Sequence, residues 1–151
     1  MEIKYFEDCE VGYECITPTR TITEADIVAY AALSSDWSEV HISKQYAEKT
    51  VFGERIAHGL LGLTIAAGLG TLGKAEFEHK IAGMCDLGWT WEFRKPIKIG
   101  DTVHARFKIA RKRETKKPDR GILYISGQLI NQKGEVVQEG EHRLMVKKKA
   151  K

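Results

Sequence analysis

The sequence predicts an α+β fold in which an antiparallel sheet wraps around one long, buried central helix. The first observation is an uncharged stretch at 59–73, which suits a core helix and is shorter than the roughly 20 apolar residues of a membrane span. The second is a series of apolar/polar alternations downstream of it, typical of strands with one buried face. The third is an amphipathic segment and a long polar segment upstream, which predict an extra helix and a loop beside the core.

The N-terminal part begins with a predicted strand over 11–20. Thr23 is a candidate N-cap, and Asp26 three residues later completes an imperfect capping box. The helix expected over 24–33 places Ile27, Tyr30 and Ala31 on one face. Residues 34–56 are polar and irregular, with a short helix expected over 43–48.

The central helix is predicted over 57–74. It is apolar on every side, and we therefore expect it to be buried on every side. Its glycines each weaken the helix by about 0.5–1 kcal/mol relative to alanine. Their expected use is close approach by the surrounding sheet, and they are Gly62, Gly68, Gly70 and Gly73.

The remainder predicts four strands, over 87–93, 103–109, 122–130 and 136–147. Turn residues separate them at 96–101, 118–121 and 131–134. The last three strands, joined by short turns, predict an antiparallel meander.

The chain of 151 residues is expected to form a single domain over 1–151, with a frayed basic tail at 147–151. Its net charge of +3 gives no reason to expect a nucleic-acid partner. Three cysteines without a CxxC pattern favour free thiols in a reducing compartment. The N-terminus lacks the apolar core of a signal peptide, so we expect a cytoplasmic protein with no membrane partner.

The motif that points to chemistry is Ser-Ser-Asp-Trp-Ser-Glu-Val-His (34–41), followed by Ala-His-Gly-Leu-Leu (57–61). Asp36 and His41 are five residues apart, a rotation of about 140° on a regular helix, so they converge only if a loop or irregular turn separates them. Long irregular loops inside compact domains are usually functional or disordered. The presence of both residues in this one favours function.

With this layout the chain resembles the MaoC-like dehydratase family, the (R)-specific enoyl-CoA hydratases of hot-dog fold. The resemblance is carried by 31–42, by Gln45-Tyr46-Ala47, by 56–61, and by the strand-turn-strand element at 93–103. Three departures from the family motif are present. Ser35 replaces a glycine, Ser38-Glu39 replaces Asn-Pro, and 54–56 lacks a proline.

The resemblance implies hydration of a trans-2-enoyl thioester to the (R)-3-hydroxyacyl thioester, and the reverse dehydration. Asp36 is the expected base and His41 its partner in holding water and moving the proton, although either could play either role. The Gly59 N–H, at a helix N-terminus, is the candidate donor to the thioester oxygen. Coenzyme A or acyl carrier protein would belong to the substrate, with no separate cofactor, and a homodimer or higher homo-oligomer is implied.

Other residues receive weaker assignments. His58 is expected to hold the entry to the helix, and no spacing of ligand residues resembles a metal site, so no metal is expected. A basic group could meet coenzyme A phosphates or form a solvated edge, and it consists of Arg94, Lys95 and Lys98. Two competing functions remain: a hot-dog acyl-CoA thioesterase, and a non-catalytic acyl-thioester-binding subunit of a heteromeric dehydratase.

Overall fold

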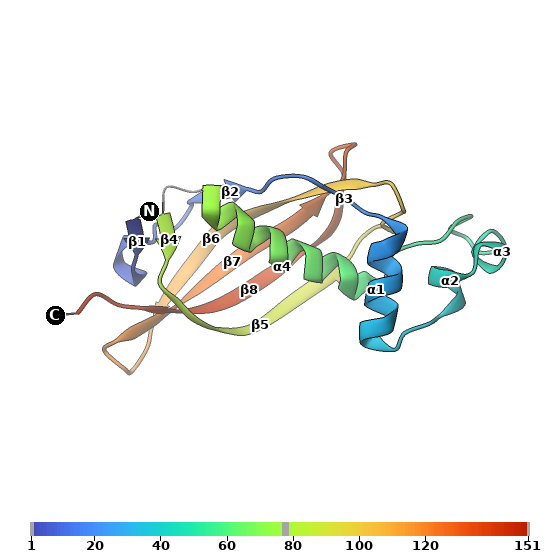
Figure 1. Ribbon diagram of the computed structural model, residues 1–151. Helices are drawn as coiled ribbons and strands as arrows, with labels where there is room; N and C mark the ends of the chain where they lie inside the picture. Colours follow the sequence, from blue (N-terminus) through green and yellow to red (C-terminus); the bar gives the residue numbers. More distant parts are fainter. Residues whose placement is uncertain (1, 77–78, 151) are drawn as a thin grey trace.

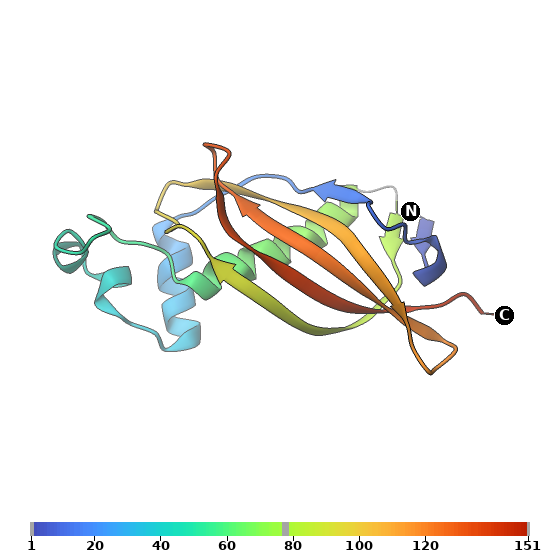
Figure 2. The same cartoon turned by 180° about the vertical axis from the view of Figure 1, so that it is seen from behind.

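One long helix lies across one face of a twisted antiparallel sheet. The computed structural model describes residues 2–76 and 79–150, and α4 (Gly59–Glu76) crosses the sheet with shorter helices gathered at one end (Figure 1). On the opposite face of the sheet, none of the described residues forms a helix (Figure 2). The predicted α+β architecture, a sheet around a central helix, is confirmed.

The sheet has the order β2-β6-β7-β8-β5, with β3 also pairing with β6. Its long strands are β5 (Gly83–Phe93), β6 (Thr102–Glu114), β7 (Arg120–Ile130) and β8 (Val136–Lys147). All of these pairings are antiparallel, so the predicted meander of the last three strands is confirmed. The predicted strand over 11–20 is instead two short pieces, β2 (Glu14–Ile16) and β3 (Arg20–Thr21).

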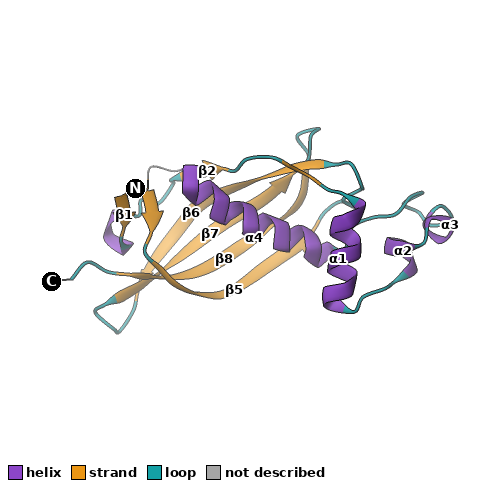
Figure 3. Ribbon diagram, in the orientation of Figure 1, coloured by secondary structure: helices purple, strands orange, loops and turns teal. Residues whose placement is uncertain are grey.

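The N-terminal helix forms where its cap predicts it. α1 (Glu24–Ser34) begins after Thr23, whose side chain accepts from the Asp26 N–H while the Asp26 carboxylate accepts from the Thr23 N–H. The capping box therefore satisfies amide groups that the helix itself leaves without partners. The long connection contains two short helices, α2 (Glu39–Ile42) and α3 (Lys44–Ala47), and only the second was predicted (Figure 3).

Three short elements, two strands and a 3-10 helix, have no counterpart in the sequence-based prediction. β1 (Glu2–Lys4) pairs in parallel with β4 (His79–Ile81), and the 3-10 helix η1 (Phe6–Asp8) follows β1. The basic end of the chain, expected to fray, instead contacts this region. Lys149 donates from its backbone to Glu7 and forms an ion pair with Asp8, while the Lys148 N–H donates to the Asp119 carbonyl.

The central helix is buried on its sheet-facing side only. Its buried residues include Leu61, Ile65, Ala66 and Leu69, whereas a stripe at Leu60, Thr64, Gly68 and Thr71 is exposed. The expectation of burial on every side is wrong, because the sheet covers one side of α4 and none of the described residues covers the exposed stripe. No helix of the described segments is both long and apolar enough to cross a bilayer.

The glycines of α4 differ in what surrounds them. A Cβ at Gly62 would lie 2.3 Å from Gln138 Nε2, and one at Gly70 would lie 3.0 Å from the Phe107 ring, while one at Gly68 would meet nothing within 4 Å. Close approach of the sheet thus explains Gly62 and Gly70 but not Gly68. Gly73 lies outside the residues whose surroundings are described.

Alanine substitutions at two of these glycines should have opposite effects on stability. Gly62→Ala should destabilise the fold by about 1–3 kcal/mol, because its methyl group overlaps a fully buried side chain. Gly68→Ala on the exposed stripe should stabilise by about 0.5–1 kcal/mol through helix propensity. Urea unfolding of both variants measures this, and equal effects would contradict the packing described for Gly62.

Candidate active site

The connection between α1 and α4, residues 35–58, brings the two residues of the motif together. Ser35 ends α1 with φ +62°, in the left-handed region, and this reverses the chain so that Asp36 follows outside the helix. Glycine adopts this conformation without strain, which is the physical reason a glycine suits this position in the family motif. His41 then lies on the short helix α2. Asp36 and His41 are thus separated by an irregular segment, as their spacing required.

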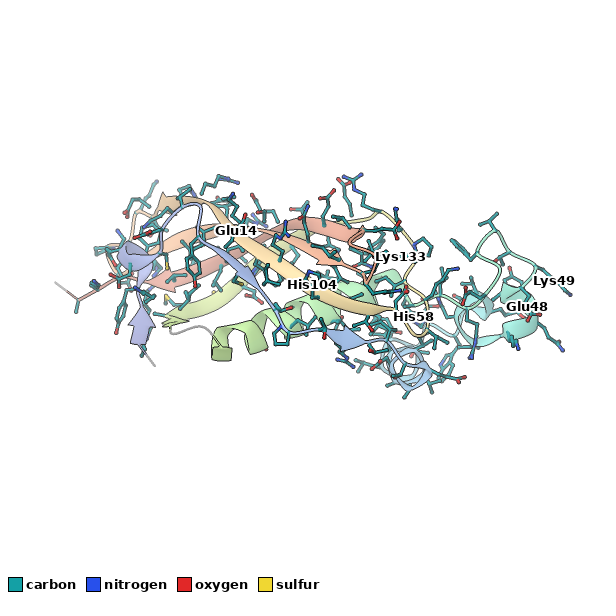
Figure 4. All side chains as sticks on the ribbon, turned by 90° about the horizontal axis from the view of Figure 1, so that it is seen from above. Glu14, Glu48, Lys49, His58, His104 and Lys133 are labelled. Atoms are coloured by element: carbon teal, nitrogen blue, oxygen red, sulfur yellow. The ribbon has the colours of Figure 1, made fainter. Side chains whose placement is uncertain are left out.

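Three side chains converge here, because His58 joins the two predicted residues. One ligand-type atom from each of Asp36, His41 and His58 lies within 4.8 Å of the others. Figure 4 shows His58 at the start of α4, with Glu48 and Lys49 farther out on the projecting loop. The sequence placed His58 at the helix entry, but its spacing from Asp36 gave no signal that the two would meet.

Backbone carbonyl groups fix both imidazole rings. His41 Nδ1 lies 2.8 Å from the Ile56 carbonyl oxygen, and His58 Nε2 lies 2.9 Å from the Asp36 carbonyl oxygen. A carbonyl oxygen only accepts, so these two ring nitrogens are the protonated ones. The rings stack with centroids 3.8 Å apart and planes inclined by 30°. His58 therefore supports the loop at Asp36 and the ring of His41 at once.

His58 is 2% exposed, and its Nδ1 is a buried atom for which no partner exists among the described residues. The Tyr30 ring also packs against the His58 ring, with centroids 4.9 Å apart and planes inclined by 50°. The expected role of His58 in holding the helix entry agrees with these contacts.

Asp36 is exposed, and its carboxylate is held by Ser38. The Ser38 hydroxyl donates to Asp36 Oδ1 at 2.5 Å, and the Ser38 N–H donates to the same oxygen at 3.2 Å. These hydrogen bonds favour the charged form and lower the pKa of Asp36, with smaller contributions from His58 and His41. Asp36 is therefore ionised at neutral pH, and Ser38 provides an anchor where the family motif has asparagine.

Removing the Ser38 hydroxyl should raise the pKa of Asp36 toward the ordinary range of aspartate. In Ser38→Ala the stronger of the two bonds is lost, so the carboxylate should protonate at higher pH than in the unaltered protein. Carbon NMR titration of the Asp36 carboxyl measures the shift. Ser43→Ala is the control, because Ser43 caps α3 in the same connection. An unchanged titration in Ser38→Ala would contradict the assigned cause.

Gly59 is the first residue of α4, directly after His58. Among the described residues no acceptor receives the Gly59 N–H, as is usual in the first turn of a helix. A Cβ here would lie 2.7 Å from the Phe93 ring, so packing against β5 is one reason for a glycine at this position. The N–H and the partial positive charge of the helix end suit an oxygen that gains negative charge.

The cluster has a donor set that metals use, but its ring geometry does not suit a metal ion. A metal bound by histidine lies in the plane of each ring, about 2.0–2.1 Å from the nitrogen. The planes of His41 and His58 are nearly stacked, and they converge only far beyond that distance. Water held between a carboxylate and an imidazole fits this arrangement better.

The basic group near the strand-turn-strand element is already paired with acids. Arg94 contacts Glu92 and Glu139, and the two lysines contact one acid each, Lys95 with Glu135 and Lys98 with Glu54. These are exposed pairs of little strength, so an incoming phosphate would have to displace a carboxylate. In this structure the three basic residues therefore form a solvated edge of ion pairs.

A second feature, absent from the sequence-based prediction, is a cavity of about 510 Å³ between α4 and the sheet. It lies near the C-terminal half of α4, beside Gly68 and Gly70, and Asp36, His41 and Gly59 do not line it. Its wall includes His142, which stacks on Trp89 and bonds to Asp86 at 2.8 Å. His142 is thus a buried residue of the sheet face that lines this cavity.

Sequence comparison links the chain to a known family. A family model described as MaoC like domain matches residues 9–126. An (R)-specific enoyl-CoA hydratase of Rhodospirillum rubrum is 34% identical over 145 residues, which cover 95% of this chain and 92% of that protein. Protein MaoC of Klebsiella aerogenes is 42% identical over 111 residues, which are 72% of this chain but 31% of MaoC. The chain therefore matches only about a third of the length of MaoC.

Structural comparison agrees on the fold. A protein of Archaeoglobus described as a monoamine oxidase regulatory protein superposes with a TM-score of 0.92 at 28% identity, covering 99% of this chain and 98% of that one. A double hot-dog protein of Mycobacterium tuberculosis superposes with a TM-score of 0.82 at 18% identity, covering 97% of this chain and 44% of that one. The second likeness concerns the fold alone, and it confirms the hot-dog architecture.

Proposed function

Because this chain belongs to the MaoC-like dehydratase family of hydro-lyases, we propose that it adds water reversibly to a trans-2-enoyl thioester. The product would be the (R)-3-hydroxyacyl thioester, the stereochemistry named for the Rhodospirillum relative. The observation that supports this most is the convergence of Asp36 and His41 beside the free N-terminus of α4. A base, a proton carrier and a donor for an oxyanion are the parts that this reaction needs.

Asp36 and His41 would act as a pair on one water molecule. The water oxygen bonds to C3, its proton passes to the pair, and C2 receives a proton on the same face of the alkene. Asp36 is ionised and can accept from water, while His41 has its Nδ1–H committed to Ile56, which leaves Nε2 as its second site for a proton.

The Gly59 N–H would donate to the thioester oxygen as it becomes an enolate. The helix fixes the direction of this N–H before the reaction begins. The donor therefore does not have to reorient when negative charge develops on the thioester oxygen. Loss of one such donor typically lowers kcat by about 10²–10³.

The direct test is hydration of crotonyl-CoA by purified protein, followed by loss of the conjugated thioester absorbance. Product stereochemistry and free thiol are assayed in parallel. We expect (R)-3-hydroxybutyryl-CoA without thiol release. Thiol release would identify a thioesterase instead. If no enoyl-CoA of any chain length is turned over, acyl-carrier-protein substrates are the next test, and inactivity with both would favour a binding subunit.

We also expect a homodimer. β5 forms one edge of the sheet, and a long unpaired edge is a site for strand pairing with another chain. Several large apolar side chains of the connection between α1 and α4 and of the first turn of α4 are exposed, among them Trp37 at 50%, Leu60 at 55% and Val51 at 97%. A second copy would bury surface of this kind. Light scattering at micromolar concentration should give twice the chain mass, and a monomer would contradict the assembly.

A further inference from the structure

Gln138 on β8 is a buried polar side chain that links the sheet to the first turn of α4. It is 2% exposed, and both ends of its amide are bonded. The Trp91 indole N–H donates to Gln138 Oε1 at 2.9 Å, and Gln138 Nε2 donates to the Gly59 carbonyl oxygen at 2.9 Å. An indole nitrogen only donates and a carbonyl oxygen only accepts, so the orientation of the amide is fixed by its two partners.

The helix is shaped to receive this side chain. Gly62, one turn after Gly59, has no side chain, and a Cβ there would overlap the Gln138 amide at 2.3–2.6 Å. Phe93 is the cross-strand neighbour of Gln138, and its ring occupies the space beside Gly59. Two adjacent residues of the sheet therefore hold the first turn of α4 in place. Gln138 does so by a hydrogen bond, and Phe93 by van der Waals contact.

We propose that Gln138 is a positioning residue, which sets the first turn of α4 and so aims the Gly59 N–H relative to Asp36 and His41. This inference rests on the proposed function. The mechanical link is short, because Gly59 follows His58, and His58 supports both the Asp36 carbonyl and the His41 ring. A shift of the first turn would misplace the oxyanion donor and loosen the catalytic pair together.

The first variant is Gln138→Met, which keeps the length of the side chain and removes both hydrogen bonds. We expect kcat for enoyl-thioester hydration to fall about tenfold to a hundredfold, the effect of a displacement of about 1 Å at a reacting centre. KM should change by less than about twofold, because substrate binding elsewhere is unaffected. Assays are run well below the melting temperature, since the partly buried Trp91 indole and Gly59 carbonyl each lose a hydrogen bond to Gln138.

The matched control is Gln128→Met. Gln128 lies on the neighbouring strand β7, and its amide donates to Glu139 rather than to α4. This variant should keep kcat within about twofold of the unaltered enzyme. Equal losses in both variants would mean that a general loss of stability, not positioning, accounts for the effect.

The second variant is Gln138→Glu, which makes the hydrogen bond to the Gly59 carbonyl depend on pH. A protonated carboxyl can accept from Trp91 and donate to the Gly59 carbonyl, whereas an ionised carboxylate repels that carbonyl. Burial should raise the pKa of the new carboxyl. Relative to the unaltered enzyme at each pH, kcat should therefore be highest at low pH and fall as the pH rises through that raised pKa. A ratio that does not vary with pH would overturn the proposal.

A readout independent of activity separates this inference from the proposed function. In amide NMR spectra, Gln138→Met should shift the Gly59 and Leu60 signals, and Gln128→Met should not. If the unaltered protein hydrates no enoyl thioester, the proposed function fails, while these spectra still decide whether Gln138 sets the first turn. Unmoved Gly59 signals, or full kcat in Gln138→Met, would overturn the inference.

Discussion

Asp36→Asn is expected to lower kcat for hydration by about 10²–10⁴, the range that general acid–base catalysis supplies. The amide that replaces the carboxylate has no charge and does not take a proton from water. Its carbonyl oxygen can still accept from Ser38, so the local geometry should survive and the loss should be chemical. Steady-state kinetics with crotonyl-CoA measures the effect.

The fold should not change in this variant, because the Asp36 side chain is exposed and its backbone carbonyl keeps the bond from His58. Asp119→Asn is the matched control. Asp119 is likewise exposed and has a lowered pKa, owing to Arg120, but it lies in the turn between β6 and β7. Full activity in Asp36→Asn would remove the mechanism proposed here, and a loss in Asp119→Asn would point to a nonspecific effect.

His41→Ala is the second large effect, again an expected loss of about 10²–10⁴ in kcat. Here the structure predicts some loss of stability as well, about 1 kcal/mol, because the Ile56 carbonyl loses a donor and His58 loses its stacking partner. Thermal melts alongside the kinetics keep the two losses apart. His104→Ala, on β6, is the control and should keep full activity.

The double variant distinguishes a catalytic pair from two independent residues. If Asp36 and His41 hold one water between them, removing both should cost little more than the worse single change. If the losses multiply instead, the two residues act in separate steps. The comparison requires the same substrate, pH and temperature for all four proteins.

Local signals in the sequence predicted the elements whose stability is local. Thr23 and Asp26 mark the start of α1 through a capping box that these two residues complete by themselves. The strand predicted over 136–147 has these bounds in the structure. Apolar and polar residues alternate along such a strand because one of its faces is buried, and this pattern can be read from the sequence. Asp36 and His41 were recognised because their spacing belongs to a motif.

The elements that failed to appear in the prediction depend on distant residues. β1 and β4 are three residues each and exist only because they pair with one another across more than seventy residues. The exposed stripe of α4 is as free of charge as the buried side, so only the position of the sheet decides which side is covered. The same holds for the Lys149 contacts with Glu7 and Asp8 at the other end of the chain.

By itself, the sequence determined the class of fold, the order of its two main helices and four long strands, and the two residues proposed to carry the chemistry. Tertiary structure alone decided that His58 stacks on His41 and that Gln138 reaches the Gly59 carbonyl. It also decided that the cavity of about 510 Å³ between α4 and the sheet lies away from Asp36 and His41. The physical reason is range: periodicity and capping act over a few residues, whereas stacking and buried hydrogen bonds arise where the folded chain brings distant side chains together.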